Sequence, residues 1–328
     1  MDKVIAVVVT YNRQQLLSEC ITALKNQTRK LDQILIINNG STDGTLDWLA
    51  KQEDLQYVTQ EDVGSAGGFY TGIRKAYADN YTWVWLMDDD GYPKEDALEK
   101  LLAGDPEELC LRNSIVVDKK DRNSLVWKTG KFTMHSQVDR RLIMNYVHPF
   151  NGTLIHRKII ERAGVPNPKL FLWGDESEYL YRIIKLNKIP CCTVTDSVHY
   201  HPATSFSYTN DWNFNSGWKM YYYVRNRYYI LISKFCRAKA IVFPLYIGFL
   251  FMFAFSIILF QRTNRLKKLS MILWPARDAM RADFSATPET ILEKLKDHYG
   301  GPVFSFRQYI PNVFGLPFSG SAHASVPE

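Results

Sequence analysis

Three consecutive carboxylates, Asp88, Asp89 and Asp90, follow a short apolar run at residues 83–87. Such a run is typical of a strand that is buried on both faces of a parallel sheet. Side chains two residues apart in an extended segment share a face, so Asp88 and Asp90 can bind one ligand. Their oxygens suit Mg²⁺ or Mn²⁺, which proteins often hold together with substrate phosphates. The alternative interpretation is that these acids only favour the start of a helix after Pro93.

A second group of candidate residues lies farther along the chain. Residues 173–178 read Trp-Gly-Asp-Glu-Ser-Glu and place Asp175 and Glu176 at the start of a predicted helix. The helix dipole alone is enough to explain acids at that position. His199 and His201 are two residues apart in a predicted strand, so they share a face, and neutral imidazole is a common metal ligand. They are either metal ligands or structural residues.

The elements that must position these residues alternate between strand and helix patterns, which predicts a doubly wound, mostly parallel α/β sheet. The first four expected strands are residues 4–9, 34–37, 55–58 and 83–87. Ligands of open α/β sheets bind outside the carboxyl ends of the strands. Polar or glycine-rich sequence follows each expected strand, at residues 10–13, 38–44, 64–69 and 88–90. This repetition predicts a ligand-binding rim.

The segment Gly-Ser-Ala-Gly-Gly-Phe at residues 64–69 is predicted to be a loop that leads into a helix. Its small residues would let backbone N–H groups approach an anion at the helix N-terminus. It lacks the spacing of dinucleotide-binding and P-loop motifs, so a tight turn remains the alternative. Later strands are expected at 115–117, 151–156 and 194–202, with a helix at 157–163 that Gly164 ends. The polar stretch after residue 117 has no assignment.

Composition limits the classes of function. At 328 residues the chain has room for one large or two smaller units. Between Lys219 and Arg281 it carries twelve basic residues and one acid, Asp278, which predicts an anionic surface or ligand near this part. No nucleic-acid-binding motif accompanies the basic residues, so no nucleic-acid partner is expected. The five cysteines form neither a CxxC pair nor a disulfide framework, which fits a reducing compartment.

Residues 240–260 contain no charge. At ~1.5 Å per residue, such a helix can cross a bilayer core of about 30 Å. Basic residues flank both ends, so their charge sets no orientation: Lys234, Arg237, Lys239, Arg262, Arg265, Lys267 and Lys268. We predict that the segment dips into or lies along the inner leaflet, broken near Pro244 and Gly248, with its basic flanks on anionic headgroups. A helix buried in an oligomer is the alternative.

Five motifs, in this order, resemble those of family 2 glycosyltransferases, which have the GT-A fold. They are Thr10-Tyr11-Asn12-Arg13, residues 38–44, residues 64–69, Asp88-Asp89-Asp90 and residues 173–178. The resemblance covers roughly residues 3–205 and is strongest to bacterial galactofuranosyltransferases, with rhamnosyltransferases next. We therefore expect a GT-A catalytic domain at 1–205. A helical C-terminal region at 206–315, with a membrane-associating segment at 240–260, and a disordered tail at 316–328 complete the expected organisation.

The resemblance implies an inverting transfer of galactofuranose or rhamnose from UDP-galactofuranose or dTDP-rhamnose. The acceptor would be lipid-linked or a polysaccharide, in cell-surface glycan synthesis. Mn²⁺ or Mg²⁺ would be held by Asp88, Asp90 and His201, with His199 as the alternative to His201. The implied donor-binding residues are Thr10, Tyr11, Asn12, Arg13, Asn38, Asp43, Gly67, Gly68 and Asp89. The implied location is the cytoplasmic face of a bacterial inner (plasma) membrane, and a homo-oligomer is also expected.

The resemblance also implies that Glu176 or Asp175 removes the acceptor proton, and that Trp173 and Glu178 bind the acceptor. The chain departs from the family at two places. Position 38 is usually Asp but here is Asn, and the acid pair is usually Glu-Asp but here is Asp175-Glu176. A sugar-1-phosphate nucleotidyltransferase shares such a sheet, but its glycine-rich, arginine-containing loop is absent after the first strand. A non-catalytic membrane scaffold that binds nucleotide sugars is the remaining alternative.

Overall fold

Two compact units make up the chain in this computed structural model. The first comprises Met1–Pro168 and Tyr179–Ala203, and the second comprises Lys169–Glu178 and Thr204–Glu328. The structure describes residues 2–104, 109–148, 150–203, 210–235 and 238–296. The tail predicted to be disordered, residues 316–328, lies outside these ranges, as does Arg237.

The first unit is built on one twisted, mixed sheet whose first half is parallel. Its parallel strands stand in the order β3-β2-β1-β4 and are β1 (Val4–Thr10), β2 (Gln33–Asn38), β3 (Gln56–Thr59) and β4 (Trp83–Asp88). Each matches a strand expected from an apolar run. Continuous apolar sequence predicts β1, β2 and β4 well because both faces of these strands are covered, whereas β3 stands at the edge of the sheet and is mostly exposed.

The second half of the sheet has mixed directions. Strand β10 (Thr153–His156) lies antiparallel between β4 and β6 (Leu111–Asp118), and β11 (Cys191–His201) lies parallel to β6. The two-residue β5 (Tyr92–Pro93) pairs with β11. The unassigned stretch after residue 118 forms three short strands, which are β7 (Ser124–Thr129), β8 (Phe132–Met134) and β9 (Leu142–Met144), and the 3₁₀ turn η1 (His135–Gln137).

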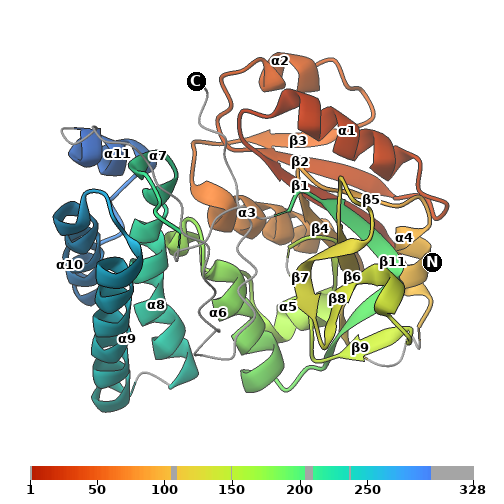
Figure 1. Ribbon diagram of the computed structural model, residues 1–328. Helices are drawn as coiled ribbons and strands as arrows, with labels where there is room; N and C mark the ends of the chain where they lie inside the picture. The colour runs from red at the N-terminus through yellow and green to blue at the C-terminus, as the bar shows by residue number, and fades with distance from the viewer. Residues whose placement is uncertain (1, 105–108, 149, 204–209, 236–237, 297–328) are drawn as a thin grey trace. The chain divides into compact units, whose positions relative to one another are not determined.

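Helices cover both faces of this sheet (Figure 1). One face packs against α1 (Gln14–Lys25), α2 (Thr45–Leu49) and α4 (Ala97–Leu102). The other packs against α3 (Gly64–Ala78), α5 (Arg157–Ala163) and the π-helical turn η3 (Arg182–Leu186). Alternate residues of β1 enter the two cores, and all are buried, so the layers are helix, sheet and helix. Gly164 ends α5 with φ +73°, as expected.

The second unit is helical. Its helices are α7 (Phe214–Gly217), α8 (Met220–Lys234), α9 (Lys239–Phe260), α10 (Arg265–Arg281) and α11 (Pro288–Lys296), and α6 (Asp175–Tyr181) begins here after the 3₁₀ turn η2 (Pro168–Leu170). The break predicted near Pro244 and Gly248 is wrong, because α9 is continuous. Pro244 lies near the N-terminus of α9, where its missing N–H removes only the bond to Ala240.

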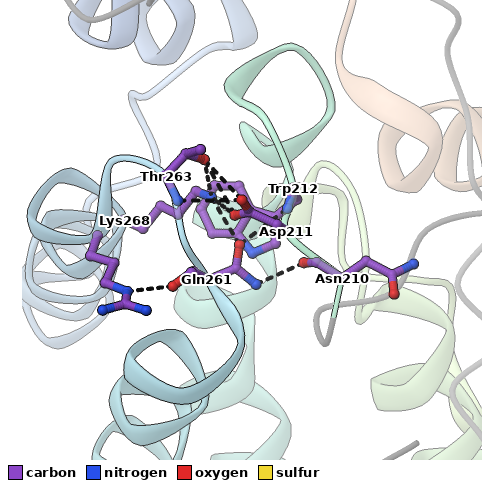
Figure 2. A network of polar contacts seen from close by, with 7 residues as sticks. Asn210, Asp211, Trp212, Gln261, Thr263 and Lys268 are labelled. Carbon is purple, nitrogen blue, oxygen red and sulfur yellow. Dashed lines mark hydrogen bonds and ion pairs between the residues drawn. The ribbon is translucent and has the colours of Figure 1, made fainter. Parts of the chain in front are cut away.

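A buried ion pair fixes the turn between α9 and α10 (Figure 2). Lys268 Nζ lies 2.6 Å from Asp211 Oδ1 and donates to Gln261 Oε1 at 2.9 Å, and both charged side chains are 1% exposed. Lys268 was expected to contact lipid headgroups, and this is wrong because its ammonium points into the unit. Lys219, Arg225 and Arg227 are buried as well, so part of the basic charge expected on a surface is internal.

Candidate active site

The three acids lie at the carboxyl end of β4, where all are buried. Thr10, the last residue of β1, donates its hydroxyl to Asp89 Oδ2 at 2.7 Å. Arg13 Nη1 lies 3.2 Å from Asp89 Oδ1 and 3.0 Å from Asp90 Oδ2. Burial acts to lower the pKa of Arg13, but Asp89, Asp90 and Asp88 outweigh it and raise that pKa. Arg13 therefore supplies the positive charge that three crowded carboxylates require.

His201 faces these acids from β11. Its Nε2 lies 3.2 Å from Asp90 Oδ1, and its Nδ1 lies 2.8 Å from the carbonyl oxygen of Pro202. A carbonyl can only accept, so Nδ1 carries the hydrogen, and Nε2 is the ring nitrogen that faces the carboxylate of Asp90. A cation between Nε2 and Oδ1, either a proton on Nε2 or a metal ion, would stabilise this contact. A backbone carbonyl on the second ring nitrogen is also the usual arrangement of a metal-binding histidine. The donor set therefore fits a divalent ion.

His199 occupies a different environment from its neighbour. It is fully buried, and a Cβ added at Gly91 would lie 2.4 Å from its Nε2. Burial, reinforced by His201, lowers the pKa of His199 to about 3, so the ring is neutral at neutral pH. Within the described ranges, no three or more His, Cys, Asp and Glu residues already surround one metal position. The geometry thus favours His201 over His199 as the partner of Asp90.

The residues that follow β1 and β2 are bonded to each other across the rim. The backbone N–H of Asn12 donates to Ser41 Oγ at 2.9 Å, and Asn12 Oδ1 accepts from the N–H of Thr42 at 2.6 Å. Asn38 Oδ1 accepts from the N–H of Ser41 at 3.1 Å. Tyr11 remains 40% exposed. Asn12 and Asn38 therefore hold the two turns together, and Tyr11 presents its ring at the surface.

Asp43 joins the same two turns to the helices that follow them. Its Oδ1 accepts from the backbone N–H of Thr45 at 3.1 Å, and its Oδ2 accepts from the N–H of Gln14 at 3.1 Å. Burial acts to raise the pKa of Asp43, but donation from Thr45 and Gln14 outweighs it and lowers that pKa. In this structure Asp43 supports the N-terminal ends of α1 and α2.

The glycine-rich segment was expected to be a loop that leads into a helix. This is wrong, because α3 already begins at Gly64. Gly67 and Gly68 are buried within the helix. A Cβ at Gly68 would lie 2.4 Å from Val9 Cγ1, and one at Gly67 would lie 2.4 Å from Val63 Cγ2. Gly68 therefore lets α3 approach β1 closely, and Gly67 leaves room for Val63 at the N-terminus of the same helix. Packing thus overrides the turn preference of this sequence.

A substitution tests this close approach. We expect Gly68→Ala to lower the free energy of unfolding by about 1–3 kcal/mol, because the added methyl overpacks the contact with Val9. Gly248→Ala is the control, since nothing lies within 4 Å of a Cβ there and alanine favours a helix by about 0.5–1 kcal/mol. Urea unfolding measures both variants. Equal midpoints for Gly68→Ala and the native chain would contradict the packing assignment.

The second acidic group lies at the start of α6 in the second unit. Asp175 and Glu176 are buried, and Glu176 Oε2 accepts from the N–H of Gly174 at 3.2 Å. Glu178 Oε1 accepts from Ser233 Oγ at 2.8 Å. Trp173 precedes the acids, with the ammonium of Lys219 5.9 Å from its ring centroid. The acids predicted to act as a base thus share one helix N-terminus, which favours their ionised form.

Sequence reasoning missed a buried polar group in the first unit. Asn151 is fully buried, and neither its Oδ1 nor its Nδ2 has a hydrogen-bond partner among the described residues. Its backbone lies next to Gly152, whose N–H donates to Leu86 in β4. Trp127 packs on both His148 and His201, with ring centroids 5.5 Å and 5.3 Å away. Asn-Gly at 151–152 signals only a turn, so no sequence pattern identifies Asn151.

Known proteins with similar sequences place the chain in a family. The sequence profile of glycosyl transferase family 2 matches residues 5–159. Galactofuranosyltransferase GlfT1 of Mycolicibacterium smegmatis is 30% identical over 217 residues, which cover 62% of this chain and 72% of GlfT1. The chain belongs to glycosyl transferase family 2. GlfT1 of Mycobacterium tuberculosis is 29% identical over 218 residues, covering 62% of this chain and 71% of its own.

Solved structures agree with the predicted fold of this family 2 chain. Residues 1–349 of S. aureus TarS, crystallised in complex with UDP, superpose with a TM-score of 0.51 over 97% of this chain and 99% of that one, at 14% identity. Such low identity shows the fold alone. The chain is a GT-A glycosyltransferase similar to galactofuranosyltransferases, and the predictions of fold and family are confirmed.

Proposed function

We propose that this chain is a metal-dependent, inverting glycosyltransferase that moves galactofuranose from UDP-galactofuranose to a lipid-linked or polysaccharide acceptor in cell-surface glycan synthesis. The similarity to GlfT1, over more than half of this chain, supports the sugar. TarS, which has the same fold, was crystallised with UDP, and this supports a uridine nucleotide. dTDP-rhamnose remains the alternative donor. We further propose that residues 1–205 carry out the catalysis.

The geometry that best supports this function is the contact between His201 Nε2 and Asp90 Oδ1 at 3.2 Å. Asp90 and His201, together with Asp88 at the end of β4, would hold Mn²⁺ or Mg²⁺. A bound divalent ion would neutralise the negative charge that develops on the departing diphosphate. Arg13, which contacts Asp89 and Asp90, would keep the acids in place and offer its cationic group to the same phosphates.

The acceptor side of the reaction requires a base. We assign Glu176 to this role, with Asp175 as the alternative, because the dipole at a helix N-terminus favours the ionised carboxylate, which is the form that can take the proton of an attacking hydroxyl. Trp173 and Glu178 would contact the acceptor. Asn151 and His148 offer buried hydrogen-bonding atoms, Nδ2, Oδ1 and Nδ1, that would suit the hydroxyl groups of the donor sugar.

The test measures release of nucleoside diphosphate from UDP-galactofuranose and dTDP-rhamnose, with Mn²⁺ or Mg²⁺ and with excess chelator. We expect UDP release that requires a divalent ion and is faster with UDP-galactofuranose. Donor binding without release would instead indicate a non-catalytic scaffold. Release of pyrophosphate from a nucleoside triphosphate and a sugar 1-phosphate would indicate a nucleotidyltransferase. NMR of the product decides whether the anomeric centre inverts.

We also propose that α9 attaches the protein to the cytoplasmic face of a bacterial inner membrane. This helix is the one described helix that is long and apolar enough to span a bilayer. One side of α9 packs against the rest of the second unit. Other sides expose large apolar side chains, each more than half exposed: Phe243, Phe251, Phe255, Ile258 and Leu259. The four described cysteines are free thiols, which supports a reducing compartment.

The packing of α9 favours a position along the membrane surface over a span. It packs beside α8 and α10, which are drawn next to it in Figure 1. Helix α10 carries exposed Arg265, Arg277 and Arg281, and a span would draw such charges toward the hydrocarbon at roughly 2.5–3.5 kcal/mol each. Leu266 and Leu273, seven residues apart on α10, are 84% and 74% exposed and add apolar surface to the same unit.

A double substitution tests the membrane surface. Phe251→Ser with Phe255→Ser removes two exposed rings that are each expected to contribute at least about 1.5 kcal/mol when buried in lipid. Binding to vesicles that contain phosphatidylglycerol should fall about a hundredfold or more. Flotation measures it. Leu186→Ser is the control, because Leu186 is 48% exposed in the first unit.

Two outcomes would contradict the membrane surface. One is equal flotation of the double variant and the native chain. The other is a stable dimer in lipid-free buffer, measured by light scattering, that the double substitution dissociates. That second result would assign the α9 surface to a homo-oligomer, which was the alternative for residues 240–260.

A further inference from the structure

Two adjacent residues of α8, Arg225 and Asn226, are fully buried against the backbone that precedes the acid pair. Asn226 Nδ2 lies 2.8 Å from each of the carbonyl oxygens of Leu170, Leu172 and Trp173. Arg225 Nη2 donates to Leu170 at 2.9 Å and to Lys169 at 3.1 Å. Arg225 Nε donates to Asn226 Oδ1 at 3.1 Å, which fixes the orientation of the amide.

The segment that these two side chains hold has an unusual backbone. Phe171 has φ +63°, Trp173 has φ +56° and Gly174 has φ +112°. Left-handed conformations are unfavourable for aromatic residues, so they persist only where the surroundings enforce them. The carbonyl groups of such a segment do not enter a regular hydrogen-bond ladder, and Asn226 and Arg225 bond several of them. The segment therefore depends on α8 for its shape.

The same face of α8 also contacts the residues after the acids. Ser233, seven positions beyond Asn226 and so on the same helix face, donates to Glu178 at 2.8 Å. Ile230 lies between them on that face, and its Cδ1 would be 3.1 Å from a Cβ at Gly174. Side chains of α8 thus hold the acid pair from both directions, through Trp173 on one side and Glu178 on the other.

We propose that Arg225 and Asn226 are positioning residues that set the location of Asp175 and Glu176 for proton removal from the acceptor. The proposal rests on the proposed function of these acids. The two residues act through the backbone of 169–174, and neither contacts substrate. Rings of Tyr222 and Phe284, with centroids 4.9 Å and 5.0 Å from Arg225 Cζ, keep its guanidinium in place.

Asn226→Asp is the sharpest test. The substitution keeps the shape and the acceptor for Arg225 Nε but removes the N–H donors to three carbonyls. Amide hydrogen exchange at 170–178 should become at least tenfold faster, and this readout needs no activity. We expect kcat to fall about a hundredfold, as for a catalytic group displaced by about 1 Å, with the KM for nucleotide sugar within threefold of native. The acid limb of the kcat profile should move to higher pH, because a displaced Glu176 loses the Gly174 N–H.

Two further variants keep the test decisive if Asn226→Asp folds poorly. Ser233→Ala removes one hydrogen bond and should lower kcat about tenfold with UDP affinity unchanged. Tyr246→Phe is the control, since it removes a buried hydrogen bond of 3.0 Å to Val224 in α8 without touching 169–178. It should leave kcat and the pH profile unchanged.

The outcomes separate this proposal from the proposed function. The positioning proposal would be overturned if Asn226→Asp left amide hydrogen exchange at 170–178 unchanged. It would also be overturned if exchange became faster while kcat and the acid limb of its pH profile stayed native. If the native chain transfers neither sugar, the proposed function fails. Faster exchange confined to 170–178 would still support the hold of α8 on this segment, and unchanged exchange would still refute it.

Discussion

Asp90→Asn is expected to lower sugar transfer at least about 10³-fold, which is the loss of several kcal/mol of charge stabilisation on the departing diphosphate. The amide keeps the size of the side chain but loses the anionic oxygen that faces His201 Nε2 at 3.2 Å. It also loses the ion pair of 3.0 Å with Arg13, which retains its contact with Asp89. Release of UDP at saturating Mn²⁺, together with calorimetry of Mn²⁺–UDP binding, measures the effect.

Two controls, Asp79→Asn and His199→Gln, and one further ligand variant, His201→Gln, accompany Asp90→Asn. Asp79→Asn breaks an exposed ion pair with Lys75 in the same unit and should leave transfer unchanged. His201→Gln should raise the concentration of Mn²⁺ needed for half-maximal rate, whereas His199→Gln should not, because only His201 faces Asp90. Full activity of the native chain in excess chelator would refute the metal role, and so would more than a tenth of native activity in Asp90→Asn.

Sequence patterns predict those strands in which nearly every residue is buried. Strands β1, β2 and β4 are covered on both faces, so continuous apolar runs identify them and place Asp88 to Asp90 at a strand end. The short strands β7 to β9 have no such pattern. They pair antiparallel as branches off the main strand order, with exposed and buried residues mixed, and the pairing of β9 with β11 joins segments that are distant in the chain.

Sequence patterns predicted which residues belong to the candidate site more completely than they predicted what each residue does there. The position of Arg13 beside Asp89 and Asp90 follows from the neighbouring strands β1 and β4. The roles of Gly68, Lys268 and Asn226 do not follow from local sequence. Glycine signals a turn, lysine signals a surface, and nothing in the aromatic, basic stretch 221–229 singles out Asn226. Each residue instead packs against a segment that is distant in the chain, and single-sequence patterns carry no information on that distance.

Glu176→Gln is expected to lower kcat by about 10²–10⁴, the usual loss when a general base is removed. In the native chain, the N–H of Gly174 donates to Glu176 Oε2 at 3.2 Å. Glutamine keeps the size of the side chain and can still accept this hydrogen bond, but it cannot take a proton. UDP and Mn²⁺ affinities should stay close to native, because the residues proposed to bind them lie in the first unit. Single-turnover transfer and UDP calorimetry separate the two effects.

Comparison with Asp175→Asn decides which acid is the base. Asp175 is the first residue of α6 and is fully buried, so we expect its amide to act mainly by weakening the helix start, with a smaller loss of kcat than Glu176→Gln. Glu289→Gln in the first turn of α11 is the control and should be silent. If Asp175→Asn abolishes turnover while Glu176→Gln keeps more than a tenth of it, the roles are exchanged. If neither variant changes kcat, a residue outside this pair accepts the proton, because replacing a carboxylate base by its amide removes the group that takes the proton and must slow the reaction.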